Sequence, residues 1–209
     1  MKGYPNDLYI LAFDHRGTLT KGLLGVEGRQ PSEEEVARVS SMKDIIFDGF
    51  LEASSKGIEG GDPAILVDET FGLQVQNRAK DMGIKLAAPV EKSGQKIFDF
   101  EYGDNFGEKI KEVNADFVKI LVRWNPDDDS ETRQIQGERI KTLSDWLDEN
   151  ERKFLLEFLV PASEEQLASV DGDQSRYDSE IRPKLAVQVV EEMRERGADP
   201  DIWKIEGLD

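Results

Sequence analysis

Short runs of apolar residues alternate along this chain with longer, charged stretches that have helical spacing. The apolar runs lie at 8–13, 64–67, 84–90, 117–122, 154–160 and 202–205. Between them, patterns typical of helices span 32–56, 71–82, 106–113, 132–150 and 179–196. This alternation predicts a parallel β-sheet covered by helices, which is an α/β fold.

The residues at the ends of these segments support the division. Ser32 precedes three glutamates, which suits a helix N-cap with acidic residues in the first turn. Gly83 and Gly197 stand where C-terminal caps are expected. The segment 18–30 has glycines and basic residues before a proline, and we expect it to form a loop after the first strand.

Repeated strand and helix units fit either an open doubly wound sheet or a closed TIM barrel, which has eight strands and about 250 residues. The 209 residues supply six such units, and no helix follows the sixth strand. An open sheet would not naturally end in this way. We therefore expect residues 1–209 to form a single (β/α)-barrel domain that is incomplete, with six of the eight βα units.

Composition restricts the partners and cofactors. The net charge of −17, from 44 acidic and 27 basic residues, repels nucleic acid and anionic membranes, so neither is an expected partner. The chain has no cysteine and one histidine, His15, which argues against a zinc site and fits a cytoplasmic protein. The N-terminal segment predicts neither a secretory signal nor a membrane span. No metal or cofactor is expected.

Three predicted strands contain an ionisable residue, at Lys119, Glu157 and Lys204. A parallel strand is buried on both faces, so such a side chain costs free energy unless it is paired. In a barrel, all three can face the interior near the carboxyl ends of the strands, where barrel enzymes carry their active sites. The unexceptional interpretation is that some of these charges form core ion pairs.

Further charged residues are expected at the same rim. The two-residue period of a strand places Arg123 on the face of Lys119 and Glu206 on the face of Lys204. Other candidates follow the first and third strands, namely Asp14, Glu91 and Lys92. We expect these five residues to contact the substrate, with the cations supplying positive charge.

This arrangement suits imine formation. A lysine with apolar walls and a second cation nearby has a lowered pKa and becomes a nucleophilic amine, and we expect Lys119 and Lys204 to lower each other's pKa. Glu157 lies between them in strand order and is the candidate for proton transfer. The sequence thus indicates a carbon–carbon lyase that acts through Lys204.

Several segments resemble a known family. They are ILAFDHRG (10–17), PVEKSG (89–94), FDFEYG (98–103), FVKILVRWNP (117–126), KFLLEFLVP (153–161) and PDIWKIEG (200–207). Together they resemble the aldolase-like domain fused to the sugar kinase of bacterial myo-inositol catabolism, of the 5-dehydro-2-deoxyphosphogluconate aldolase type. That domain is similar to the class I tagatose-bisphosphate and sulfofructose-phosphate aldolases, barrels that cleave ketose phosphates to dihydroxyacetone phosphate and an aldehyde.

The resemblance implies roles for individual residues. It assigns the Schiff base to Lys204, proton transfer to Glu157, a place beside the imine to Lys119, and contact with substrate hydroxyls to Asp14. It also implies a phosphorylated keto sugar or keto sugar acid as the substrate. The family's phosphate-binding groups come largely from loops after strands seven and eight, which are not among the six units here.

Two alternatives stay open. The chain could be a non-catalytic or ligand-sensing barrel that forms a homo-oligomer or binds a completing segment, because an incomplete barrel exposes strand edges. The segment FDHRGTL (13–19) also resembles the FDxDGTL motif of haloacid dehalogenase-like phosphatases. Arg16 stands at the second aspartate of that motif, where it cannot accept a proton and would repel Mg²⁺.

Overall fold

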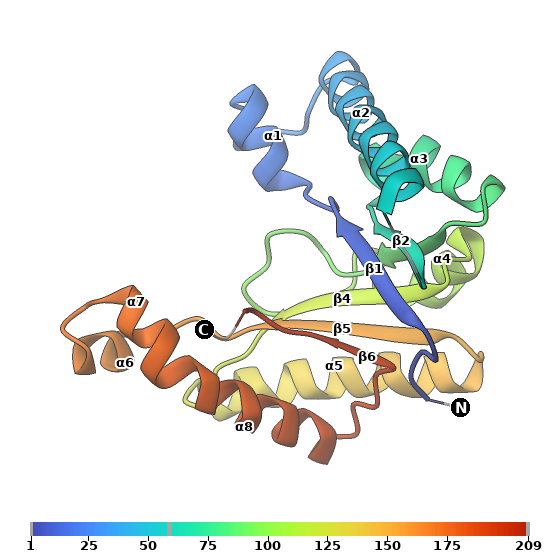
Figure 1. Ribbon diagram of the computed structural model, residues 1–209. Coiled ribbons are helices and arrows are strands. Elements are labelled where there is room, and N and C mark those ends of the chain that lie inside the picture. Colours follow the sequence, from blue (N-terminus) through green and yellow to red (C-terminus); the bar gives the residue numbers. More distant parts are fainter. Residues whose placement is uncertain (1, 58–59, 208–209) are drawn as a thin grey trace.

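The computed structural model describes residues 2–57 and 60–207 and shows a single parallel sheet with helices on its outer side (Figure 1). The strands are β1 (Asp7–Ala12), β2 (Gly61–Leu66), β3 (Lys85–Pro89), β4 (Phe117–Arg123), β5 (Lys153–Leu159) and β6 (Ile202–Lys204). They are hydrogen-bonded in the order β1-β2-β3-β4-β5-β6. This order matches a barrel, because a doubly wound sheet reverses its strand order in the middle.

The helices follow the strands as the pattern predicted. They are α1 (Gly17–Leu24), α2 (Glu33–Gly57), α3 (Glu69–Asp81), α4 (Phe106–Val113), α5 (Ser130–Glu149), α6 (Glu164–Ser169), α7 (Gln174–Arg176) and α8 (Arg182–Glu195), with short turns η1 (Gly103–Asn105) and η2 (Tyr177–Ile181). Within residues 2–57 and 60–207, none is long and apolar enough to cross a membrane.

Three predicted helix caps are confirmed, whereas one predicted loop is partly wrong. Ser32 Oγ accepts the amide of Glu35, and Glu35 accepts the amide of Ser32 in return, which is a capping box. Gly83 and Gly197 have φ of 70° and 91°, the left-handed conformation of helix C-caps. The predicted loop at 18–30 is wrong in its first half, because α1 forms there although it contains two glycines and two threonines.

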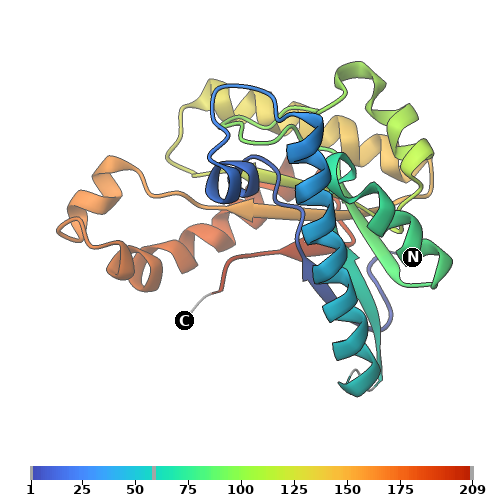
Figure 2. The ribbon, with the colours of Figure 1, turned by 90° about the horizontal axis from the view of Figure 1, so that it is seen from above.

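The sheet curls into an open half-barrel. In both ribbon views β1 lies across the interior from the β4 to β6 end of the sheet (Figures 1 and 2). Asp14, directly after β1, contacts Lys119 of β4 across this interior. The edge strands β1 and β6 are not paired with each other in the sheet.

Alternate side chains along each strand point to opposite faces of the sheet, where they form separate apolar clusters. The outward residues of β4 and β5 pack with α5 and α8, and those of β2 and β3 pack with α2 and α3. The inward residues form a third, smaller apolar layer, which consists of Leu66, Ala87, Phe117 and Leu155 with Leu8, Ile10, Ala12 and Ile202 against them. This layer closes the bottom of the half-barrel, and the next inward position on each strand lies above it.

Candidate active site

Charged side chains occupy the inward positions above the apolar layer. On β4 the inward face runs from Phe117 through Lys119 to Arg123. On the neighbouring strands, Glu157 of β5 lies opposite Lys204 of β6 in register. The curl of the sheet therefore turns the charges of three strands toward one space.

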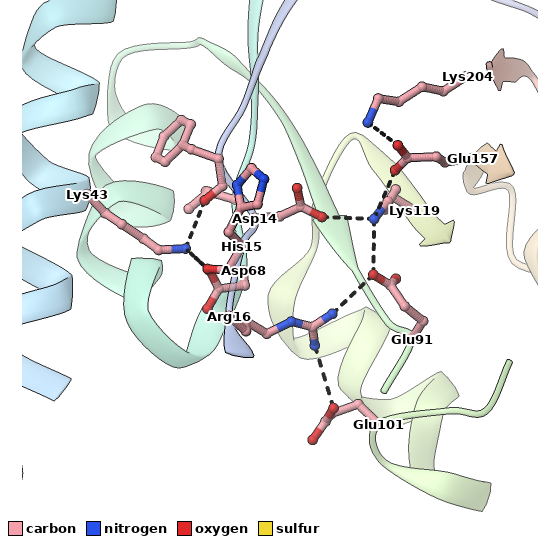
Figure 3. Close-up of polar contacts among 12 residues, drawn as sticks. Asp14, His15, Arg16, Lys43, Asp68, Glu91, Glu101, Lys119, Glu157 and Lys204 are labelled. Carbon is pink, nitrogen blue, oxygen red and sulfur yellow. Dashed lines mark hydrogen bonds and ion pairs between the residues drawn. The ribbon is translucent and has the colours of Figure 1, made fainter. Parts of the chain in front are cut away.

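Lys119 is 2% exposed, and its ammonium contacts three carboxylates (Figure 3). Its Nζ lies 2.8 Å from Asp14 Oδ2, 3.0 Å from Glu91 Oε1 and 3.2 Å from Glu157 Oε2. Burial alone would lower the pKa of Lys119, but the three carboxylates outweigh it and raise the pKa above its ordinary value. The expected lowering for Lys119 is therefore wrong, because its nearest charged neighbours are carboxylates.

Glu157 connects the two lysines (Figure 3). Its Oε1 accepts a hydrogen bond from Lys204 Nζ, and its Oε2 pairs with Lys119. The side chain of Lys204 is 38% exposed, whereas that of Glu157 is 15% exposed. The structure thus brings the three predicted catalytic residues together and gives the two amines different surroundings.

The pKa values of Asp14 and Glu91 are shifted in opposite directions. Burial would raise the pKa of Asp14, but the charges of Lys119 and Lys204 prevail and lower it. Burial raises the pKa of Glu91 despite the nearby cations of Lys119 and Arg16. Glu91 Oε1 accepts from Arg16 Nη2 at 3.0 Å, while its Oε2 has no hydrogen-bond partner in the part of the chain that the structure describes.

These groups open into a cavity of about 860 Å³, which is large enough for a phosphorylated sugar. The lining comes from β1, β4, β5 and β6, from the loop after β3, and from α1, whose Gly17 and Thr18 border the space. Lys92 and Arg123, two of the residues predicted to bind substrate, line the cavity and bring positive charge to it. Arg123 Nη1 is held by the carbonyl of Gln95 at 2.9 Å.

Glu206 is the one predicted site residue that the structure places elsewhere. It is not among the residues that line the cavity. Its carboxylate pairs with Arg182 at 3.1 Å and accepts the amide of Val160 at 3.1 Å. The expectation fails because β6 ends at Lys204, so the two-residue alternation no longer applies two positions later.

Two residues of this region were not predicted as site residues. Arg16 was considered only within the phosphatase motif, yet it is 12% exposed and links Glu91 to Glu101. Lys43 is fully buried beneath the loop after β1. A signal for Lys43 exists in the sequence, since it stands four residues from both Val39 and Phe47 on an apolar helix stripe.

The phosphatase alternative finds no support in the site. Asp14, its nucleophile, pairs with Lys119, and Arg16 pairs with Glu91. Across residues 2–57 and 60–207, no three histidine, aspartate or glutamate side chains are grouped so that they could hold a metal ion. The Mg²⁺ on which those enzymes depend therefore has no apparent ligand set in these ranges.

Comparison with known proteins shows the family. The model of a family described as "Uncharacterized protein conserved in bacteria (DUF2090)" matches residues 2–209. The chain belongs to the DUF2090 family. It is also 23% identical over 201 residues to a tagatose 1,6-diphosphate aldolase of Lactococcus lactis subsp. lactis, and 24% identical over 201 residues to one of Streptococcus pneumoniae serotype 4.

The DUF2090 chain spans about half the length of these curated relatives. Each alignment covers 94% of the chain and 56% of the relative. Among solved structures, a protein of Corynebacterium glutamicum is similar over 72% of this chain and 47% of its own, with a TM-score of 0.42 and 18% identity.

Proposed function

We propose that this protein is a class I aldolase in which Lys204 forms a Schiff base with a phosphorylated keto sugar. The observation that carries the proposal is the contrast between the two lysines. Lys119 is buried among three carboxylates that keep it protonated, so it is a poor nucleophile. Lys204 is exposed to the cavity and pairs with Glu157, a carboxylate that can accept its proton.

The cleavage then proceeds with Glu157 as the proton carrier. The neutral amine of Lys204 adds to the ketone carbon, and the carbonyl oxygen leaves as water to give an iminium ion. Glu157 takes the proton from the hydroxyl on the cleaved carbon, so the O–H electrons form the aldehyde carbonyl as the carbon–carbon bond breaks. The released pair forms an enamine, which Glu157 protonates, and water then frees the product ketone from Lys204.

The charges of the cavity indicate how the substrate is held. Lys92 and Arg123 supply positive charge for a phosphate group in a chain whose net charge is −17. Asp14 and Glu91 are acceptors for sugar hydroxyls, and Glu91 Oε2 is free of other partners among the described residues. Relatives named tagatose 1,6-diphosphate aldolase support a ketose phosphate as substrate. A role in inositol catabolism rests on the sequence resemblance alone.

The test is borohydride reduction of the protein in the presence of dihydroxyacetone phosphate. Reduction fixes an imine as a secondary amine, so peptide mass spectrometry should show Lys204 heavier by the ligand mass less one oxygen atom. Lys119 in the same sample is the internal control, because its protonated amine should stay unmodified. An adduct on Lys119 would contradict the assignment. So would the absence of any adduct, or an adduct that persists in Lys204→Arg.

We also propose that a further polypeptide segment covers the outer face of β1. Its outward residues Tyr9 and Leu11 are 48% and 38% exposed, although the outward residues of β2 to β5 are buried under helices. The unpaired edges of β1 and β6 offer hydrogen-bonding groups to a strand beside them. A segment of βα type fits this surface, and the relatives' greater length is of the size that could supply one.

Hydroxyl-radical footprinting of the protein as its host makes it tests this coverage. We expect Tyr9 and Leu11 to react less than their exposed fractions in the half-barrel imply. Ile45 on α2, which is 70% exposed, is the control and should react fully. Reaction of Tyr9 and Leu11 in proportion to those exposures would count against a covering segment, and sedimentation would show whether a second copy is the occupant instead.

A further inference from the structure

Lys43 is a buried cation outside the cavity. It lies on α2 with 0% exposure, and Val39 and Phe47 one turn on either side are also fully buried. An ammonium in such a place costs free energy unless all of its protons are bonded. The hydrogen-bond partners of Lys43 therefore indicate its role.

Two of the three partners of Lys43 lie in the segment that follows β1 (Figure 3). Nζ donates to the carbonyl of Phe13 at 2.8 Å and to the carbonyl of His15 at 3.1 Å. It also pairs with Asp68, which is 1% exposed. The two carbonyls flank Asp14 in the chain, so Lys43 fixes the backbone on both sides of this residue.

Asp68 anchors the other end of this arrangement. Its second oxygen accepts the amide of Phe71 at 2.9 Å and so caps the N-terminus of α3. Gly72 lets α3 approach closely, since a Cβ there would lie 2.3 Å from Val67 Cγ2. The side chain of Lys43, which extends from α2, is thereby enclosed by α3 and the segment after β1.

A contribution to stability does not by itself explain the buried ion pair of Lys43 and Asp68. Burial lowers the pKa of Lys43 and raises the pKa of Asp68, so desolvation works against the charged forms of both. Buried ion pairs can often be replaced by uncharged residues without loss of stability. The two bonds from Lys43 to backbone carbonyls are specific to the loop and would be lost in such a replacement.

We propose that Lys43 is a positioning residue, which holds the backbone on both sides of Asp14 so that the Asp14 carboxylate points into the cavity at Lys119. The inference rests on the proposed function for its catalytic consequence, since Asp14 contacts substrate hydroxyls there. Phe13 and His15 turn their carbonyls toward Lys43, and Asp14 Oδ2 reaches Lys119 Nζ at 2.8 Å. The amide of Phe13 also donates to the carbonyl of Leu66 at 2.9 Å, so Lys43 acts together with this bond before Asp14 and alone reaches the carbonyl of His15 after it among the described contacts.

The test variant is Lys43→Met with Asp68→Asn. It removes one positive and one negative charge together, so the net charge is unchanged and no buried charge is left alone. Asparagine at 68 can still cap Phe71. The matched control is Asp68→Asn alone, in which Lys43 keeps its donors to Phe13 and His15, because even a neutral amine has two N–H groups.

The first readout is the titration of Asp14, followed by carboxyl ¹³C NMR and assigned with Asp14→Asn. In the wild type and in Asp68→Asn, the pKa of Asp14 should be low because Lys119 and Lys204 lie nearby. In the double variant we expect the pKa to rise toward its ordinary value. The second readout is turnover of a ketose bisphosphate, which should fall about 100-fold, as when a group that orients the substrate is displaced by about an ångström.

The outcomes separate this inference from the proposed function. If Asp14 titrates identically in the double variant and in Asp68→Asn, the positioning role is wrong, whether or not Lys204 forms an adduct. If the pKa of Asp14 is no longer lowered in the double variant but Lys204 of the wild type forms no adduct, the positioning role stands and the aldolase proposal fails. Should the double variant not fold, Lys43→Gln with Asp68→Asn replaces it, because glutamine is too short to reach both carbonyls and the same rise is expected.

Discussion

Glu157→Gln should lower kcat about 100- to 10,000-fold, the range lost when a general acid–base residue is removed. Glutamine keeps the size of the side chain, and its amide oxygen can still accept a hydrogen bond from Lys119, so the cavity should keep its shape. It cannot accept the hydroxyl proton that must leave before the carbon–carbon bond breaks. Steady-state cleavage of tagatose 1,6-bisphosphate, the substrate in the relatives' names, measures the effect.

The borohydride adduct on Lys204 distinguishes loss of proton transfer from loss of the site. In Glu157→Gln the adduct should still form, although more slowly, because the amine and the ketone are unchanged. Glu206→Gln is the matched control, since Glu206 is a nearby carboxylate that pairs with Arg182 outside the cavity. Turnover near the wild-type rate in Glu157→Gln, or an equal loss in Glu206→Gln, would refute the role given to Glu157.

Lys119→Met should destabilise the fold by about 3–5 kcal/mol at neutral pH, the usual cost of removing one partner from a buried ion-pair group. Lys119 is 2% exposed, so solvent does not screen its contacts with Asp14, Glu91 and Glu157. Without the ammonium, these carboxylates face one another with little water. Urea unfolding at pH 7 gives the free energy of unfolding. Lys85→Met, which breaks an exposed pair with Asp116, is the control and should cost at most about 1 kcal/mol.

The pH dependence of this loss has a definite sign. In the wild type, the raised pKa of Lys119 gives stability that is present at neutral pH and is lost only as the pH rises through that raised value. In Lys119→Met, the carboxylates are the groups with unfavourable charge, so their pKa values rise on folding. The variant should therefore lose stability as the pH rises above about 4 and regain it on acidification. A loss that is the same at pH 5 and pH 7 would show that missing side-chain volume, not charge, is the cause.

The sequence identified the strands and the main helices because apolar periodicity depends on local geometry. The six predicted runs correspond to β1 to β6. It also identified Lys119, Glu157 and Lys204 as exceptional, since a charge within a buried strand needs compensation wherever the strand lies. It missed α1, a short helix that contains two glycines and two threonines, and treated Lys43 as part of an ordinary helix.

The sequence alone therefore determined which charged residues lie within buried strands and in which order the strands follow one another. Only the tertiary structure decided which charges meet. The contact of Asp14 with Lys119 depends on the curl of the sheet, and that of Lys43 with Phe13 depends on the packing of α2 beside the end of β1. The same curl reversed the expected direction of the pKa shift of Lys119, whereas Glu206 lies outside the cavity because β6 ends at Lys204. Electrostatic effects depend on distance and burial in space, and neither can be read from spacing along a strand.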